Sequence, residues 1–302
     1  MKLGGSIVWR MRQLKGRTAI VTGASRGIGA HIARALAREG VNLALVARGT
    51  DSLTQLAAEL SQLGVRAVPV VADLADLARL HSVIERAEAQ LGAIDILINN
   101  AGIHAIRMFA DESGAQTEEM LRINLLSPVE LTHKLLPKLL ARKTGHIVNI
   151  ASLAGKSSAP YSVSYSTSKA GLVTFSHCLR NELRGTGVSV SVVCPGFVTD
   201  EGMFSVVMRK HGAQVSPLLG TVKPEQVARS VLRALRHDSI ELSVNPGPIR
   251  WVMALNQLAP GTVAWVQDRV LGVNGMLRKV ALADRNEPVP RSSVTSGSPR
   301  RA

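Results

Sequence analysis

The chain has 302 residues, of which 46% are hydrophobic and 19% are charged, so it can bury the core of a globular protein. Its 36 lysines and arginines exceed its 22 acidic residues, which gives a formal net charge of +14. The excess is spread along the chain and aromatic residues rarely lie beside the cations. This pattern argues against a nucleic-acid-binding protein.

The cysteines and the apolar runs predict the compartment. The two cysteines, Cys178 and Cys194, have no metal-ligand spacing and are too few for a disulfide framework, so we expect two buried free thiols and no metal site. No stretch reaches the ~20 apolar residues that cross a bilayer. The basic N-terminal segment, 1–13, holds an apolar run that is shorter than that of a signal peptide. We therefore predict a cytoplasmic protein.

From residue 14 to 245, short apolar β-branched runs alternate with longer amphipathic stretches. This alternation is typical of a doubly wound α/β domain, in which helices cover both faces of a parallel sheet. Pro128 and Pro137 should kink or interrupt the longest predicted helix. We predict strands over 18–23, 42–48, 65–73, 94–102, 146–152 and 188–196, and helices over 27–39, 53–63, 76–91, 117–142 and 165–184.

The sequence changes character after the domain. Residues 246–285 have apolar residues at helical spacing and are predicted to form a C-terminal helical extension, whereas 286–302 are rich in Pro and Ser and are predicted to be disordered. The basic region 249–280 either packs on the domain or a second subunit, which we favour, or lies on an anionic membrane surface.

The run TGASRGIG (22–29) lies between the first predicted strand and helix. Gly23 permits a tight exit from the strand, and Gly27 and Gly29 let backbone amides approach a pyrophosphate at the positive end of the helix. Strand, glycine-rich turn and helix together indicate a dinucleotide-binding site.

The end of the second strand bears on the choice of cofactor. Arg48 stands where NAD-binding proteins offer a carboxylate to the ribose 2′-hydroxyl. Arg48 and Arg26 can clamp a 2′-phosphate, so we predict a preference for NADP(H). The alternative is that both are solvated surface arginines and that NAD(H) binds. Asp73, after the third strand, either accepts from the adenine amino group or caps the next helix.

Several further motifs follow in order: AD (72–73), NNAG (99–102), RINLLSP around Asn124, VNIAS ending at Ser152, YSTSK (165–169) and PG (195–196). With TGASRGIG they make residues 16–245 resemble the short-chain dehydrogenase/reductase family. The resemblance implies a Rossmann-type sheet of about seven strands, a nicotinamide cofactor, and a homodimer or homotetramer.

The resemblance also implies residue roles. Tyr165 matches the proton donor or acceptor, and Lys169 matches the lysine that binds the nicotinamide ribose and activates that tyrosine. Ser152 matches the residue that holds the substrate oxygen, and Asn124 the one that orders a water in the proton relay. The implied cofactor-binding residues are Gly23, Ser25, Arg26, Gly27, Ile28, Gly29, Arg48, Asp73, Leu74, Asn100, Ala101, Gly102, Tyr165, Lys169, Pro195, Gly196, Val198 and Thr199.

The sequence departs from the family pattern at one position. The family commonly has a threonine five residues after the proline of PG, where it contacts the carboxamide of the cofactor. Here that residue is Asp200, and Thr199 comes one position earlier. Thr199 can take over this contact only with a shifted backbone.

The spacing of Tyr165 and Lys169 supports their roles independently. Four residues apart on a helix, the two side chains share one face. A phenol with a pKa near ~10 is a poor base at neutral pH, and a nearby ammonium lowers that pKa. The chain's other tyrosine, Tyr161, follows Pro160 and is predicted to precede the helix as a wall of the substrate cleft or a packing residue.

We therefore predict an NADP(H)-dependent oxidoreductase that transfers a hydride between nicotinamide and a carbonyl or secondary alcohol. The apolar segment 202–220 is expected to cover the substrate and favours a lipid-, steroid- or acyl-like molecule; the equally weighted alternative is that its apolar residues only pack this segment onto the domain. The alternatives are a β-ketoacyl thioester reductase and a non-catalytic nucleotide-sensing or scaffold protein. His104, His133 and His146 are predicted to be structural or surface groups.

Overall fold

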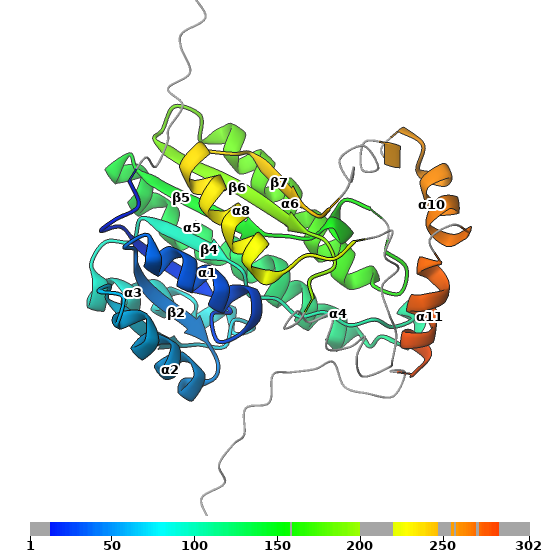
Figure 1. The fold of residues 1–302 in the computed structure, drawn as a ribbon, viewed down its shortest axis with the longest axis horizontal. Coiled ribbons are helices and arrows are strands. Elements are labelled where there is room, and N and C mark those ends of the chain that lie inside the picture. The colour runs from blue at the N-terminus through cyan, green and yellow to red at the C-terminus, as the bar shows by residue number, and fades with distance from the viewer. Residues whose placement is uncertain are drawn as a thin grey trace, which may run out of the picture.

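The protein folds around one sheet of seven parallel strands, in the order β3-β2-β1-β4-β5-β6-β7 (Figure 1). The computed structural model describes residues 13–157, 159–199, 220–246, 255–256, 258–269 and 272–283. The predicted fold class, a doubly wound parallel sheet, is confirmed. The strands are β1 (Thr18–Thr22), β2 (Asn42–Ala47), β3 (Ala67–Val71), β4 (Ile96–Asn99), β5 (Gly145–Ile150), β6 (Val188–Pro195) and β7 (Glu241–Val244).

Helices cover both faces of the sheet. The long helices of the domain are α1 (Gly27–Arg38), α2 (Thr50–Ser61), α3 (His81–Leu91), α4 (Gly114–Leu121), α5 (Ser127–Arg142), α6 (Val163–Glu182) and α8 (Pro224–His237). Buried side chains of α1, α2 and α8 pack on one face, and those of α3, α5 and α6 on the other. Neighbouring strand residues alternate between the two cores, as Ala19 and Ile20 do in β1. This explains why the strands read as continuous apolar runs.

The connection pattern places a crevice beside β1. The chain runs outward from β1 to β2 and β3, then returns to pair β4 on the other side of β1. In doubly wound sheets, ligands bind outside the carboxyl ends of the strands at such a switch point. Here the Gly23 turn after β1 and the Asn100 loop after β4 meet at that point.

The helix predicted over 117–142 is confirmed, since residues 114–142 are helical throughout. α4 ends at Leu121, a π-helical turn, η3 (Arg122–Leu126), follows without a gap, and α5 begins at Ser127. Pro128 lies directly after the π-turn and Pro137 lies inside α5, and neither interrupts the helix. The irregularity is the π-turn, and π-turns are frequent at functional sites.

Two helices follow the domain, α10 (Pro260–Arg269) and α11 (Val273–Ala283), at the right of Figure 1. α11 buries Val273, Leu277 and Val280 in a cluster with Ile106. On α10, in contrast, Trp265 is 61% exposed. None of the helices in the described ranges is both long enough and apolar enough to span a membrane.

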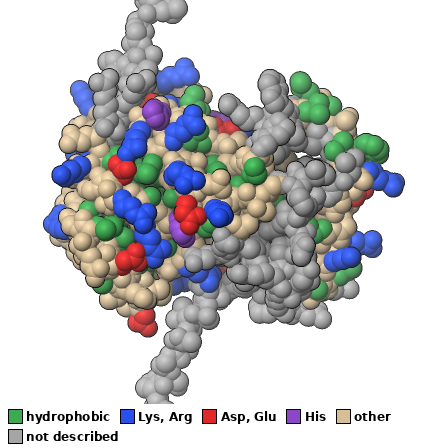
Figure 2. All heavy atoms as spheres, viewed as in Figure 1, with side chains coloured by type: hydrophobic (Ala, Val, Ile, Leu, Met, Phe, Trp, Pro, Cys, Tyr) green, Lys and Arg blue, Asp and Glu red, His purple; other side chains and the backbone are tan. Residues whose placement is uncertain are grey.

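The surface carries the excess positive charge in a dispersed form. On the face shown in Figure 2, Lys and Arg side chains lie at many separate places among acidic side chains. The prediction of two buried thiols is wrong for one of them: Cys194 is buried in β6, but Cys178 is exposed on α6. The predictions for 1–12, for Asp200, for the covering segment 202–219 and for the tail from 284 onward lie outside the described residues.

Candidate functional site

The turn between β1 and α1 depends on its glycines. Gly23 and Gly27 have positive φ angles of 66° and 55°, which glycine adopts without a steric penalty. A Cβ on Gly29 would lie 2.1 Å from the carbonyl oxygen of Gly23. Arg26, the N-cap of α1, makes no side-chain cap hydrogen bond. The helix end therefore faces the crevice with a compact backbone, the arrangement that accepts a phosphate.

The loop after β4 is joined to this turn by hydrogen bonds. The Thr22 hydroxyl accepts from the N–H groups of Asn100 and Ala101, at 2.9 and 3.0 Å. The Asn100 side chain donates to the carbonyl oxygens of Thr22 (2.9 Å) and Gly23 (3.3 Å). The NNAG motif thus holds the two loops of the crevice together.

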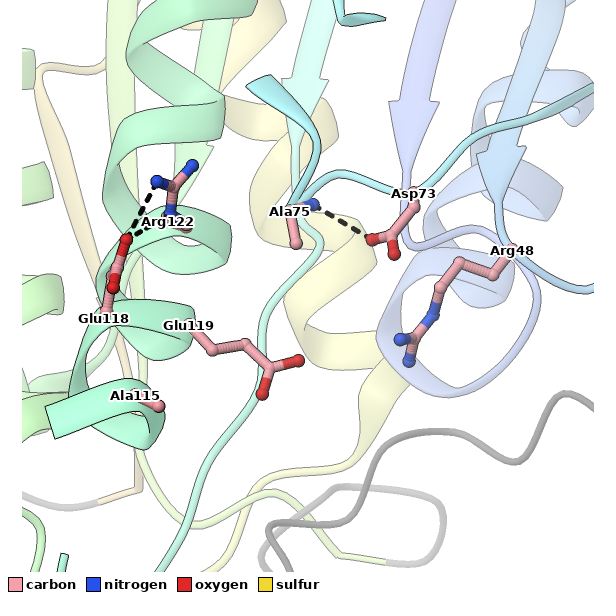
Figure 3. A pocket seen from close by; sticks show the side chains of 7 residues that line it. All are labelled: Arg48, Asp73, Ala75, Ala115, Glu118, Glu119 and Arg122. Atoms are coloured by element: carbon pink, nitrogen blue, oxygen red, sulfur yellow. Dashed lines mark hydrogen bonds and ion pairs between the residues drawn. The ribbon is translucent and has the colours of Figure 1, made fainter. Parts of the chain in front are cut away.

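A cavity of about 290 Å³ opens where β2 and β3 end (Figure 3). In Figure 3 the side chains of Arg48 and Glu119 point toward the same space, one from the end of β2 and the other from α4. Asp73 accepts from the Ala75 N–H at 3.0 Å, so it closes its own turn and also lines the cavity. The remaining lining residues are Ala115, Glu118 and Arg122.

Tyr165 and Lys169 lie on α6, as their spacing predicts. Lys169 is 3% exposed; its Nζ donates to the Ile150 carbonyl at 2.9 Å and lies 6.0 Å from the centroid of the Tyr165 ring. Burial lowers the pKa of Lys169 to about 8. Tyr165, predicted to be the proton donor or acceptor, and Lys169, whose pKa is lowered, therefore lie close together on α6.

The direction of the Tyr165 pKa differs from the expectation. Burial raises the pKa of the phenol, a hydrogen bond with Ser152 partly offsets this, and Cys194 adds to the rise. The expected lowering requires a strong effect of positive charge on the phenol, whereas here burial is the largest cause of the shift. The phenol is therefore protonated at neutral pH and ready to donate.

Ser152 and Asn124 both contact α6 or its side chains, through a hydrogen bond of Ser152 with Tyr165 and one of Asn124 with Ser168. Ser152 follows β5 and accepts from the Ala154 N–H at 3.1 Å. Asn124, fully buried in the π-turn, donates to the Ile103 carbonyl (2.9 Å) and to the Ser168 hydroxyl (3.1 Å) and accepts from the Ile103 N–H (2.8 Å). Asn124 thus ties the loop after β4 to α6, while its ordering of a water stays a prediction.

The loop after β6 carries the remaining predicted cofactor contacts. Thr199 is held by Val222, because its N–H donates to the Val222 carbonyl at 2.9 Å and its hydroxyl lies 3.4 Å from the same oxygen. Val198 forms an isolated bridge with Val222. A Cβ on Gly196 would lie 2.2 Å from Oδ1 of Asn245. The other predicted residues are placed as follows: Pro195 ends β6, Gly102 lies against Asn124, Leu74 is buried, and Ser25 and Ile28 are partly buried beside the glycine turn.

One residue beside Tyr165, His104, was predicted from the sequence to be only a structural or surface group. His104, two residues after NNAG, stacks on Tyr165 with ring centroids 4.2 Å apart. The available signal was its position in a loop that leaves the carboxyl end of a central strand, where ligand crevices form. Tyr161, in contrast, precedes α6 as predicted and packs against the α11 cluster.

Comparisons with known proteins agree with this geometry. The sequence profile of the short chain dehydrogenase family matches residues 17–210. Ketoacyl reductase HetN from Nostoc sp. is 40% identical over 258 residues, which is 84% of this chain and 88% of that protein. Nodulation protein G from a Rhizobium species is 32% identical over 270 residues, which is 89% of this chain and all of that protein.

A solved structure points the same way. A metagenomic short-chain oxidoreductase in complex with NADP superposes with a TM-score of 0.65 at 31% identity, covering 77% of this chain and 98% of that one. The profile match, the two relatives and the shared fold show that the chain belongs to the short-chain dehydrogenase/reductase family of oxidoreductases.

Proposed function

We propose that this enzyme is an NADP(H)-dependent reductase or dehydrogenase that interconverts a carbonyl and a secondary alcohol. The observation that carries the proposal is the placement of Tyr165, Lys169 and Ser152 around one point at the carboxyl ends of the strands. The NADP bound to the related metagenomic oxidoreductase and the ketoacyl reductase activity named for HetN support it.

The crevice fits a nicotinamide dinucleotide. A Cβ at Gly23 or Gly29 would collide with neighbouring atoms, so only glycine fits at these positions. The resulting close backbone at the start of α1 is where a pyrophosphate would bind. Arg48 and Asp73 line the cavity at the far end, next to the position of an adenosine ribose. Arg48 supplies the positive charge that a 2′-phosphate needs, which supports NADP(H) over NAD(H).

The chain's own residues account for proton transfer. Bound NADPH would supply the hydride to the carbonyl carbon. Tyr165, protonated because burial raises its pKa, donates its proton to the substrate oxygen as negative charge develops there. The Ser152 hydroxyl donates a hydrogen bond to the same oxygen. Lys169, with a pKa of about 8, stabilises the resulting phenolate until solvent returns the proton.

We propose an apolar substrate. Tyr161 lies just before α6 and packs against the apolar cluster that Ile106 forms with α11, so an apolar surface adjoins the start of the helix that carries Tyr165. The name of the HetN relative favours one specific alternative within this class, a β-ketoacyl thioester. A non-catalytic role is disfavoured, because a binding protein has no need of a buried lysine beside a protonated phenol.

The test is NADPH oxidation against a panel of apolar ketones and acetoacetyl thioesters. Tyr165→Phe removes the proton donor and should lower kcat by about 100-fold or more. The matched control is Tyr161→Phe, the same change in the chain's only other tyrosine, which should keep wild-type turnover. Equal turnover by wild type and Tyr165→Phe would refute the catalytic assignment.

The cofactor preference needs a separate measurement. Arg48→Asp places a carboxylate in the cavity and should weaken NADPH binding by about tenfold or more, while NADH binding changes little. The matched control is Arg38→Asp, an exposed arginine in the last turn of α1 that does not line this cavity. An unchanged ratio of NADPH to NADH affinity in Arg48→Asp would overturn the phosphate-clamp proposal.

A further inference from the structure

The side chain of His104 covers one face of the catalytic tyrosine. The two rings have centroids 4.2 Å apart and are tilted by 51°. His104 Nε2 also lies 3.1 Å from Oγ of Ser162, the buried residue at the N-cap position of α6, whose hydroxyl makes no cap hydrogen bond. The imidazole therefore bridges the loop after β4 and the helix that carries Tyr165.

The backbone around His104 is held at both ends. The preceding residue, Ile103, has its N–H and its carbonyl bound to the Asn124 side chain. Three residues further on, the Arg107 N–H donates to the Tyr161 carbonyl at 2.7 Å. Because this short loop is fixed at two points, the His104 imidazole has a defined position. A residue can orient the Tyr165 ring only if its own position is fixed in this way.

The imidazole beside the phenol is neutral. Burial, with a contribution from the charge of Lys169, lowers the pKa of His104 to about 4. Among the described residues, the titratable and polar groups that act on the phenol are Ser152 after β5, Lys169 on α6 and the thiol of Cys194 in β6. A neutral imidazole in contact with the phenol ring adds no charge to this set.

We propose that His104 is a positioning residue, whose imidazole, anchored by Ser162, packs on the Tyr165 ring and directs the phenol toward the substrate oxygen. The inference rests on the proposed function of Tyr165 as the proton donor. It adds a residue outside the Asn124–Ser152–Tyr165–Lys169 set and assigns it a contact with that donor.

The first test does not need turnover. In a Tyr161→Phe background Tyr165 is the only phenol of the chain, so its ionisation can be followed directly by tyrosinate absorbance. His104→Ala opens one ring face to water and should lower the pKa of Tyr165 toward its ordinary value, whereas His104→Phe keeps the face covered and should leave it high. An unchanged pKa in folded His104→Ala would overturn the proposal, whether or not a substrate is known.

The second test uses the reductase assay. His104→Ala should lower kcat about tenfold with little change in the KM for NADPH, because a misdirected donor slows the chemical step while the cofactor site stays intact. His104→Phe should recover part of the loss. The matched control is His133→Ala, an exposed histidine of α5, which should have no effect. An unchanged kcat in His104→Ala, or equal loss in His133→Ala, would contradict the inference.

A third variant keeps the test decisive if His104→Ala fails to fold. Ser162→Ala removes only the hydroxyl that anchors the imidazole and should lower kcat several-fold. Added to His104→Phe, which has no nitrogen to anchor, it should cause no further loss. Full additivity of the two changes would show that Ser162 does not act through His104. Loss of activity in Tyr165→Phe with no effect of any His104 or Ser162 change would leave the proposed function standing and refute this inference alone.

Discussion

Replacement of Asn124 by alanine tests how the site is assembled. The substitution removes three hydrogen bonds, two with the main chain of Ile103 at 2.8 and 2.9 Å and one with Ser168 at 3.1 Å. Each contributes about 1 kcal/mol net, and the groups left without partners in the loop cost about 1–3 kcal/mol more. Because Asn124 is fully buried, water does not replace these partners easily. We therefore expect Asn124→Ala to lose about 4–6 kcal/mol of unfolding free energy.

Urea denaturation followed by far-ultraviolet circular dichroism measures this loss, with the m-value as a check that the transition is unchanged. Gln90→Ala is the control: its amide makes one exposed 3.3 Å hydrogen bond to Arg86 on α3, so its loss should stay within about 0.5 kcal/mol. Activity of Asn124→Ala should also fall, because the loop that carries His104 is no longer tied to α6. A destabilisation below about 1 kcal/mol would refute the reasoning that Asn124 holds this loop.

Three further predictions concern the cofactor crevice and the buried histidines. Gly29→Ala places a Cβ 2.1 Å from a carbonyl of the turn, so we expect about 1–3 kcal/mol of destabilisation and weaker NADPH binding, measured by denaturation and fluorescence titration; wild-type values would contradict the close packing. Glu119→Gln removes a negative charge from the cavity that Arg48 lines. In binding titrations the ratio of NADPH affinity to NADH affinity should therefore rise several-fold, and by less in high salt. A fall in that ratio would contradict the charge argument. Burial lowers the pKa of His104 and His146 from 6.5 in the unfolded chain to about 4 in the folded protein. As the pH falls below 6.5 the unfolded chain therefore binds protons that the folded protein does not, and the unfolding free energy should decline down to about pH 4, by up to about 3 kcal/mol for fully buried His146. Denaturation measured at stepped pH checks this, and an unfolding free energy that does not change over this range would contradict it.

Most of the fold was predictable because the signals are local. Runs such as 18–23 and 188–196 are mostly apolar with only small polar residues, since both faces of the sheet are covered, and they read as buried strands. β7 gave no such signal: Glu241–Val244 is a half-buried edge strand with mixed residues. The π-turn at Arg122–Leu126 was also not visible, because RINLL is compatible with a regular α-helix and the π-turn accompanies contacts that Asn124 makes with a distant loop.

Part of the candidate site was also predictable from local signals, and part was not. Tyr165 and Lys169 were found because residues four apart on one helix lie on the same face, so their spacing alone places the two side chains together. His104 was not found, because its contact with Tyr165 depends on how two loops are anchored, by Asn124 and by Ser162. Tertiary hydrogen bonds of this kind leave no periodic pattern in the sequence. The rise in the pKa of Tyr165 was missed for a related reason, since burial is a property of the folded site.

The most direct test of the central claim is hydride transfer itself. NADPH carrying deuterium at the transferable C4 position is incubated with the enzyme and a reducible ketone, and the alcohol is analysed by mass spectrometry. We predict that wild type places deuterium on the carbinol carbon and that Tyr165→Phe forms this product about 100-fold or more slowly. An alcohol without deuterium at that carbon, or equal rates in the two proteins, would contradict it.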